Sequence, residues 1–366
     1  MNQQSLLVPQ LANSSFTGAL RRILGSFAFL VLLSSSGAAQ AQPQQFAVCP
    51  NGCQSIVLPG GNQLLAEAGA MPNHPQLIGT DPNGDQLSIP FLGGLPSGRA
   101  SDGAPFGPVA YALDGRNLFI ALGEADEFHS GGPSFIKRAP VIPFVCSIIQ
   151  ATFSADVAAS GPFILSPANS QQLLNAQAVT LWDFSGNSAA LQQIATLGVA
   201  AHPSGLATIA GAPNTLFLVD SGTKRLLAID RATHQVTTVA QFPAKPESLH
   251  RFDDRHLIVT LFGAVPDGSA VYLLDPTAGA SRSVAGQLNS AVDAVSGCYS
   301  GTVLVLENNG DPQGLGQLLA VSSDGTPARV LANGLNDPTN VWIDEFTGRV
   351  FIFSRGDGVV YTVPLP

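Results

Sequence analysis

Four acidic residues stand at corresponding places in a repeated pattern and are the strongest candidates for chemistry in this chain. Glu67, Glu124, Asp220 and Glu307 each follow an apolar run and lie close to Gly or Asn. Equivalent positions of a circular repeat lie around one central channel. Carboxylates gathered there repel each other unless a cation neutralises them. Calcium takes oxygen ligands in flexible geometry and is abundant outside cells. One interpretation of the pattern is therefore a calcium site formed by these four residues at the rim of a central channel.

A second interpretation of the same residues needs no metal. The acids would then hydrogen-bond to backbone amides of nearby loops or pair with Arg355, which stands at the corresponding place in the last repeat. Another repeat offers only Thr260 there, so the acidic set is incomplete. The chain has no zinc-protease, nucleophile-elbow or phosphate-loop motif, and its six histidines are scattered, mostly in turns. The sequence gives no catalytic residues and favours a binding protein over an enzyme.

The runs that carry the acids are the second strands of a repeated four-strand unit. Residues 204–242 hold four short apolar runs separated by turn residues, and such runs return about every 40–50 residues, the period of propeller blades. The second strands are predicted at 63–67, 117–121, 215–219, 256–260, 302–306 and 349–353. Third strands end in Asp81, Asp230 and Asp275, where Asx side chains stabilise the following turn. The pattern predicts an all-β, six-bladed β-propeller.

One interval between second strands, of about 98 residues, is twice the usual length. Residues 124–188 therefore hold either an insertion or an additional blade, which would make seven. We interpret them as a small β-α-β insertion in blade two, with strands near 162–165 and 179–184 and a helix at 167–177. The preceding loop, with Lys137 and Arg138, is a second candidate binding surface.

The two ends of the folded chain are predicted to complete one blade together. The sequence stops after three strands of its last blade, and an open edge there would invite aggregation. Residues 45–49 can supply the missing strand by pairing with residues 359–363. We therefore expect one closed propeller domain over residues 42–366.

Residues 1–41 have the pattern of a secretory signal peptide. Arg21 and Arg22 precede an apolar stretch at 23–33, and Ala39-Gln40-Ala41 offers a cleavage site. The stretch is too short to span a bilayer. We expect export through the Sec pathway to the periplasm or beyond the cell, and no membrane span in the mature chain.

Composition narrows the class of partner. The chain is 45% hydrophobic and only 11% charged, with 38 Gly and 27 Pro, which suits an exported all-β protein. Its net charge is −9, and loss of Arg21 and Arg22 with the signal makes it −11. An acidic chain argues against nucleic acid and anionic membranes as partners. We expect a monomer.

Four cysteines lie in a chain expected in an oxidising compartment. Cys49 and Cys53 flank a Pro-Asn-Gly turn, which allows a local disulfide between them. Cys146 and Cys298 have no evident partner, and each is expected as a small buried apolar side chain.

Several segments of residues 248–366 resemble a known family. SLHRFDDRHLIVTLFGAVPDGSAVYLLDP, SAVDAV, TVLVLENN, GQLLAVSSDG and LNDPTNVWIDEFTGRVFIF are similar to the carboxy-terminal half of the ScyD/ScyE family, and LLAEAG and GLPSG are also similar to its members. These are exported bacterial propellers, first associated with genes for the pigment scytonemin. More distant similarity extends to NHL-repeat and gluconolactonase-like propellers.

The resemblance implies two functions between which a fold alone does not decide. The first is a non-catalytic binding or scaffolding module for a small molecule, a glycan or a protein. The second is a calcium-dependent hydrolase of the lactonase or esterase type, because gluconolactonase-like propellers hold their metal in the central channel.

Overall fold

A computed structural model gives the fold of part of the chain. It describes residues 43–48, 105–123, 146–153 and 189–197, and most of 201–364. Within the last range the gaps are 264–268, 298–300, 312, 323–327 and 345–347. Short strands between 53 and 99, and at 128–129, 136–137, 163–164 and 182–183, are described by their backbone alone. The signal peptide predicted at 1–41 and the helix predicted at 167–177 lie outside the described residues.

The main sheets are named here by their first strands. The β16 sheet contains β16 (Pro203–Ala207), β17 (Thr215–Asp220), β18 (Arg225–Asp230) and β19 (Val236–Gln241) in that order. The β20 sheet contains β20 (Lys245–Arg251), β21 (Leu257–Phe262), β22 (Ser269–Asp275) and β23 (Ala280–Leu288). The β24 sheet contains β24 (Ala291–Ser296), β25 (Thr302–Glu307), β26 (Gly316–Ser322) and β27 (Arg329–Leu335).

Three further sheets are built on the same plan. The β28 sheet contains β28 (Pro338–Asp344), β29 (Arg349–Ser354), β30 (Val359–Pro364) and β1 (Gln44–Val48). The β8 sheet contains β8 (Pro108–Asp114), β9 (Asn117–Leu122), β12 (Ser147–Phe153), β15 (Ala189–Thr196) and β14 (Trp182–Asp183). The β2 sheet contains β2 (Cys53–Val57), β3 (Gln63–Glu67), β4 (Gln76–Thr80), β5 (Ile89–Gly93) and β13 (Phe163–Ile164).

Burial within a sheet follows strand position. The second strands β9, β17, β25 and β29 bury every residue after their first, which matches their continuous apolar sequences. The outer strand β19 is mostly exposed. The apolar core lies between neighbouring sheets: Phe119 and Ile148 of the β8 sheet share a cluster with Leu216 and Leu218 of the β16 sheet. Similar clusters join the β16 sheet to the β20 sheet, the β20 sheet to the β24 sheet and the β24 sheet to the β28 sheet.

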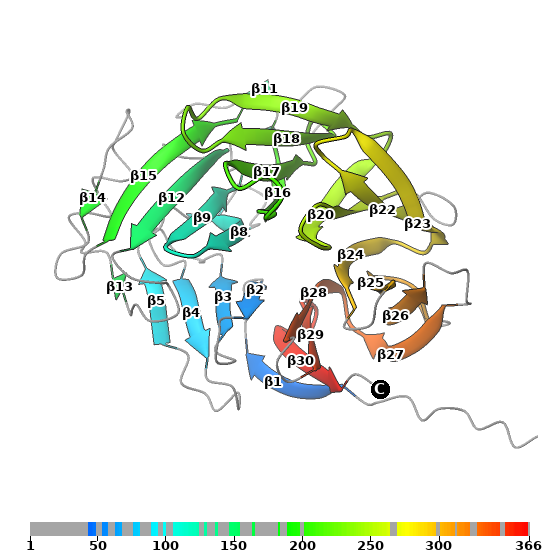
Figure 1. The fold of residues 1–366 in the computed structure, drawn as a ribbon. Helices are drawn as coiled ribbons and strands as arrows, with labels where there is room; N and C mark the ends of the chain where they lie inside the picture. Colours follow the sequence, from blue (N-terminus) through cyan, green and yellow to red (C-terminus); the bar gives the residue numbers. More distant parts are fainter. Residues whose placement is uncertain are drawn as a thin grey trace, which may run out of the picture. The chain divides into compact units, whose positions relative to one another are not determined.

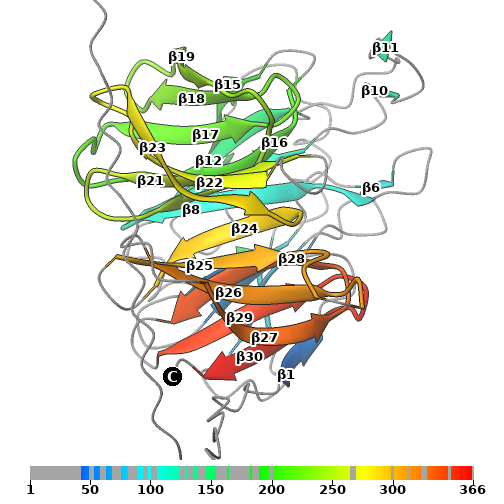
Figure 2. The same ribbon diagram turned by 90° about the vertical axis from the view of Figure 1, so that its right-hand side faces the viewer.

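The first strands meet around a common axis. β16 contacts β8 and β20, β24 contacts β20 and β28, and β2 contacts β8 and β28. Figure 1 looks along this axis, and Figure 2 shows several sheets stacked beside one another from the side. The described residues therefore form an all-β propeller.

The structure and the sequence differ on two points of detail. Five sheets are described with side chains, one fewer than the predicted six blades, because the β2 sheet is described by its backbone alone. The two short strands of the predicted insertion also join different sheets. β14 pairs with β15, but β13 pairs in parallel with β5 of the β2 sheet. Each short strand covers an outer edge, which removes exposed backbone hydrogen-bonding groups.

The predicted pairing of the two ends of the domain is confirmed. β1 is antiparallel to β30, with Gln44 opposite Thr362 and Val48 opposite Val359. The Phe46 ring packs edge-on against Phe351, with ring centroids 4.8 Å apart. The last sheet therefore takes its outer strand from the opposite end of the domain.

Two local predictions are also confirmed. Asp230 and Asp275 accept hydrogen bonds from backbone amides two and three residues later, as expected of turn aspartates. Cys146 is buried, and its thiol donates to the carbonyl of Ala201 over 3.2 Å. Cys49, Cys298, Asp81 and the side chain of Cys53 lie outside the described residues. In the part of the chain that the structure describes, no helix is long and apolar enough to cross a bilayer.

Candidate functional site

The four acids of the predicted calcium site are only partly described. Glu67 ends β3, whose backbone alone is described, and Glu124 lies outside the described residues. Asp220 and Glu307 end β17 and β25, and both side chains are buried. These two can be compared atom by atom.

Asp220 holds the loop that precedes the first strand of its own sheet. Its Oδ1 accepts the backbone amide of His202 at 2.8 Å and that of Thr223 at 3.3 Å. Its Oδ2 accepts the Thr223 hydroxyl and lies 3.5 Å from an Arg225 nitrogen. Hydrogen bonds and a cation thus compensate the buried charge without a metal.

Glu307 makes the same connection in the β24 sheet. Its Oε1 accepts the Asn289 amide at 2.5 Å, and its Oε2 accepts the Gln317 side-chain amide at 2.7 Å. In the β28 sheet, the Ser354 hydroxyl donates to the Asn336 carbonyl at 2.5 Å. In all three sheets the loop partner lies 18 residues before the strand-end residue. We call these the strand-end contacts: Asp220 with His202, Glu307 with Asn289, and Ser354 with Asn336.

The strand-end contacts agree with the interpretation that needs no metal, for the two acids that are described. Arg355 binds Asp337 through two hydrogen bonds, the shorter at 2.6 Å. Among the described residues, no three His, Cys, Asp or Glu side chains gather closely enough to hold a metal ion. Because Glu124 and the side chain of Glu67 lie outside the described residues, the calcium site stays a prediction.

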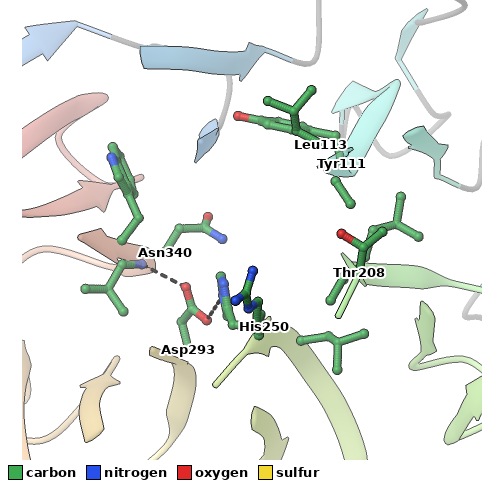
Figure 3. A pocket seen from close by; sticks show the side chains of 14 residues that line it. Tyr111, Leu113, Thr208, His250, Asp293 and Asn340 are labelled. Atoms are coloured by element: carbon green, nitrogen blue, oxygen red, sulfur yellow. Dashed lines mark hydrogen bonds and ion pairs between the residues drawn. The ribbon is translucent and has the colours of Figure 1, made fainter. Parts of the chain in front are cut away.

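A cavity of about 240 Å³ lies among the first strands instead. Its wall comes from β8, β16, β20, β24 and β28 together with Thr208, which directly follows β16. Figure 3 shows its polar side chains, which include Tyr111, Thr208, His250, Asp293 and Asn340. Neither Asp220 nor Glu307 lines this cavity.

The centre of the cavity wall is a histidine–aspartate pair that joins two sheets. Asp293 Oδ1 lies 2.8 Å from His250 Nε2 and accepts the Ala294 amide at 2.9 Å. Asp293 Oδ2 accepts the Val341 amide of β28 at 2.8 Å (Figure 3). Asp293 is 0% exposed, whereas a third of the His250 side chain is exposed. This carboxylate therefore links three sheets, and we call His250 and Asp293 the cavity pair.

A repeated β-bulge places Asp293 where it can reach both neighbours. In β8, β16, β20, β24 and β28 the register against the second strand shifts near the start of the strand, and the first paired residue after the shift has an equivalent position in each sheet. These residues are Ala110, Gly205, Ser248, Asp293 and Asn340. A Cβ atom at Gly205 would lie 2.6 Å from the Leu249 nitrogen, so the sheets approach closely here. The carboxylate of Asp293, which stands at the same position as Gly205, can therefore reach the neighbouring sheet.

The charge of His250 depends on Asp293. Burial disfavours the imidazolium, but the negative charge of Asp293 and the hydrogen bond to it outweigh that effect, so the pKa of His250 lies above its ordinary value of 6.5. The imidazole is therefore more readily protonated near neutral pH than a free histidine, and a proton can be held at the cavity wall.

The sequence does not predict the cavity pair, because neither residue belongs to a recognisable motif. His250 is one of six scattered histidines, and Asp293 lies in a short apolar run, SAVDAV. An alignment of the first strands, rather than the more apolar second strands, would have shown a single carboxylate among small or amide side chains. That alignment was the available signal.

The comparisons with known proteins give a fold and no activity. No family model and no curated protein matches the chain. A protein of unknown function from Bacteroides thetaiotaomicron VPI-5482 is similar in structure, with 11% identity, 88% of this chain and 76% of that chain covered, and a TM-score of 0.51. The β-propeller domain of Myceliophteria thermophila Cps50 (Swd1) shows 10% identity, coverage of 89% and 99%, and a TM-score of 0.48. At such low identity, a structural likeness concerns the fold alone.

Proposed function

We propose that the protein is a binding module that holds a small polar molecule in the cavity among its first strands. The observation that carries this proposal is the cavity pair: a histidine fixed by a buried carboxylate and exposed to a hollow of about 240 Å³. Thr208 and Asn340 add neutral hydrogen-bonding groups to the same wall. Pockets that bury drug-sized ligands measure about 300–1,000 Å³, so this one suits a smaller molecule.

The wall is well suited to holding a ligand in one orientation. Its side chains lie on strands that neighbouring sheets pack from both sides, and Asp293 ties together the strands that carry His250 and Val341. A rigid wall loses little conformational freedom when it binds, so more of the contact energy appears as affinity.

We also propose the finer features that the sequence suggests. The propeller would have six blades, supported by the contacts of β2 with both β8 and β28, which close the ring of first strands. The protein would be an exported relative of the ScyD/ScyE family, supported by the segments of residues 248–366 quoted above and by the signal-like residues 1–41. Export through the Sec pathway would bring the cavity into contact with solutes outside the cytoplasm.

Ligand-observed NMR with a defined panel of probes tests the proposed site. The panel contains neutral monosaccharides, sugar acids and short hydroxy acids, each at millimolar concentration with the full-length mature protein. Thr208→Phe places a large ring in the cavity and should abolish the binding signals. Thr238→Phe makes the same change on the exposed strand β19 and should leave them intact.

Two results would contradict the proposed site. One is that no probe in the panel binds, and the other is that binding persists in Thr208→Phe. Circular dichroism and melting curves of both variants establish that each is folded, so that a lost signal reports on the cavity.

A calcium-dependent hydrolase remains the alternative proposal, because Glu67 and Glu124 are not described. It requires bound metal in the purified mature protein and a rise in melting temperature with calcium relative to chelator, since a ligand that binds only the folded state stabilises it. Elemental analysis with paired melting curves decides between this alternative and a metal-free binding module.

A further inference from the structure

The described lining of the cavity has more basic than acidic side chains. Asp293 is the one carboxylate among the described lining residues, and both of its oxygens already accept hydrogen bonds from protein donors. Arg251 and, when protonated, His250 contribute two positive charges to the same wall. The chain as a whole carries a net charge of −9, so a lining with more basic than acidic side chains differs from its overall composition.

The second ring nitrogen of His250 can donate a hydrogen bond to a ligand. Its Nε2 is taken by Asp293, and no described residue bonds to Nδ1. A protonated imidazole donates from both nitrogens, so Nδ1 can donate to a ligand while Nε2 stays on Asp293. Arg251 forms an ion pair with Asp254, but both side chains are more than half exposed, which makes that pair weak and replaceable.

We propose that the cavity binds a small organic carboxylate, which accepts a charge-assisted hydrogen bond from His250 Nδ1 and faces the Arg251 guanidinium. This inference rests on the proposed function and names the chemical class of its ligand. Asp293 acts as a positioning residue, because it orients the imidazole and supplies the negative charge that favours its protonated form. Thr208 and Asn340 are placed to hydrogen-bond with the neutral part of the ligand.

The charged groups around His250 make the binding depend on pH in one direction. Among the strands packed against β20, β24 contributes Asp293, β17 contributes Asp220 in its strand-end contact, and β16 and β21 carry no ionisable side chain. Across the cavity β8 contributes Tyr111. β20 itself carries Arg251, which lines the cavity, and Lys245 and Glu247, which pair with each other and do not line it. Because the pKa of His250 lies above 6.5, a falling pH populates its imidazolium, and the carboxylate should bind more tightly toward mildly acidic values.

Lactate and lactamide provide a matched test, because they have nearly the same shape and differ in charge. We expect lactate to bind at least about tenfold more tightly at about pH 5.5 than at about pH 9, the effect of one charge-assisted hydrogen bond. Lactamide should bind equally at both pH values. The measurement is ligand-observed NMR titration of the wild-type protein, which needs no variant to fold.

Two histidine variants sharpen the result. His250→Gln should remove the pH dependence and lower lactate affinity about tenfold at about pH 5.5, to the level of lactamide. His256→Gln is the control, because His256 also pairs with an aspartate, Asp253, but does not line the cavity. It should leave lactate binding unchanged.

The outcomes separate this inference from the proposed function. Equal binding of lactate and lactamide at both pH values, or no binding of lactate at about pH 5.5, overturns the carboxylate inference. If neutral probes of the wider panel still bind in a way that Thr208→Phe abolishes, the proposed binding site stands without it. If nothing in the panel binds, the proposed function fails as well.

Discussion

The strand-end contacts of Asp220 and Glu307 and the cavity pair all contain a buried carboxylate, but the partners of these carboxylates differ. Asp220 and Glu307 accept hydrogen bonds from their own sheets, and neither faces the cavity. Asp293 accepts hydrogen bonds from two neighbouring sheets, and one of its partners is a titratable side chain that the cavity exposes. A buried carboxylate therefore indicates function less by its burial than by the kind of partner that compensates its charge.

The largest expected effect comes from breaking the cavity pair. Asp293→Ala leaves His250 and the Val341 amide without their acceptor and removes the hydrogen bonds by which Asp293 links three sheets. Removing one partner of a buried, hydrogen-bonded pair costs about 3–5 kcal/mol of unfolding free energy. Urea denaturation measures it. Asp254→Ala, at an exposed ion pair, is the control and should cost at most about 1 kcal/mol. Similar losses in the two variants would contradict the linking role of Asp293.

A smaller effect is expected at the strand-end contacts. Glu307→Ala leaves the Asn289 amide and the Gln317 side chain without their acceptor, which should cost about 1–3 kcal/mol. Glu307→Gln keeps one acceptor oxygen and should cost less. Both variants should bind the NMR probes as the wild type does. Loss of probe binding with stability intact would show that this region, too, belongs to the binding site.

The smallest effect is a pH dependence of the unfolding free energy, which the cavity pair should confer and the strand-end contacts should not. Because the folded-state pKa of His250 is raised above 6.5, its pair contributes stability that is fully present below that value and is lost as the pH rises through the folded-state pKa. Denaturation of the wild type across this range should show the loss, and His250→Gln should remove it. His256→Gln should retain it. Stability that rises with pH through this window in the wild type alone would reverse the proposed charge of the pair.

The strands were predictable because burial on both faces leaves a strong signal in the sequence. β9, β17, β25 and β29 lie within one or two residues of the positions expected from their apolar runs. The pairing of β1 with β30 was predictable for a different reason, since a three-stranded last blade needs one more strand. The turn aspartates followed from local chemistry that involves only their nearest neighbours.

The candidate site was less predictable, because its partners are distant in the sequence. His250 and Asp293 are 43 residues apart, and Asp293 and Val341 are 48 apart. Nothing local distinguishes these residues from other histidines and aspartates of the chain. The prediction from the sequence instead favoured the ends of the second strands, where acids recur at visible intervals.

The sequence by itself determined the repeated strand unit, its turns and the pairing of its two ends, because hydrophobic periodicity and turn chemistry act over a few residues and repeat along the chain. Only the tertiary structure decided which carboxylates stay within their own sheets and which one reaches across. That choice depends on how closely neighbouring first strands approach at their bulges, and this distance is set by the packing of whole sheets against one another.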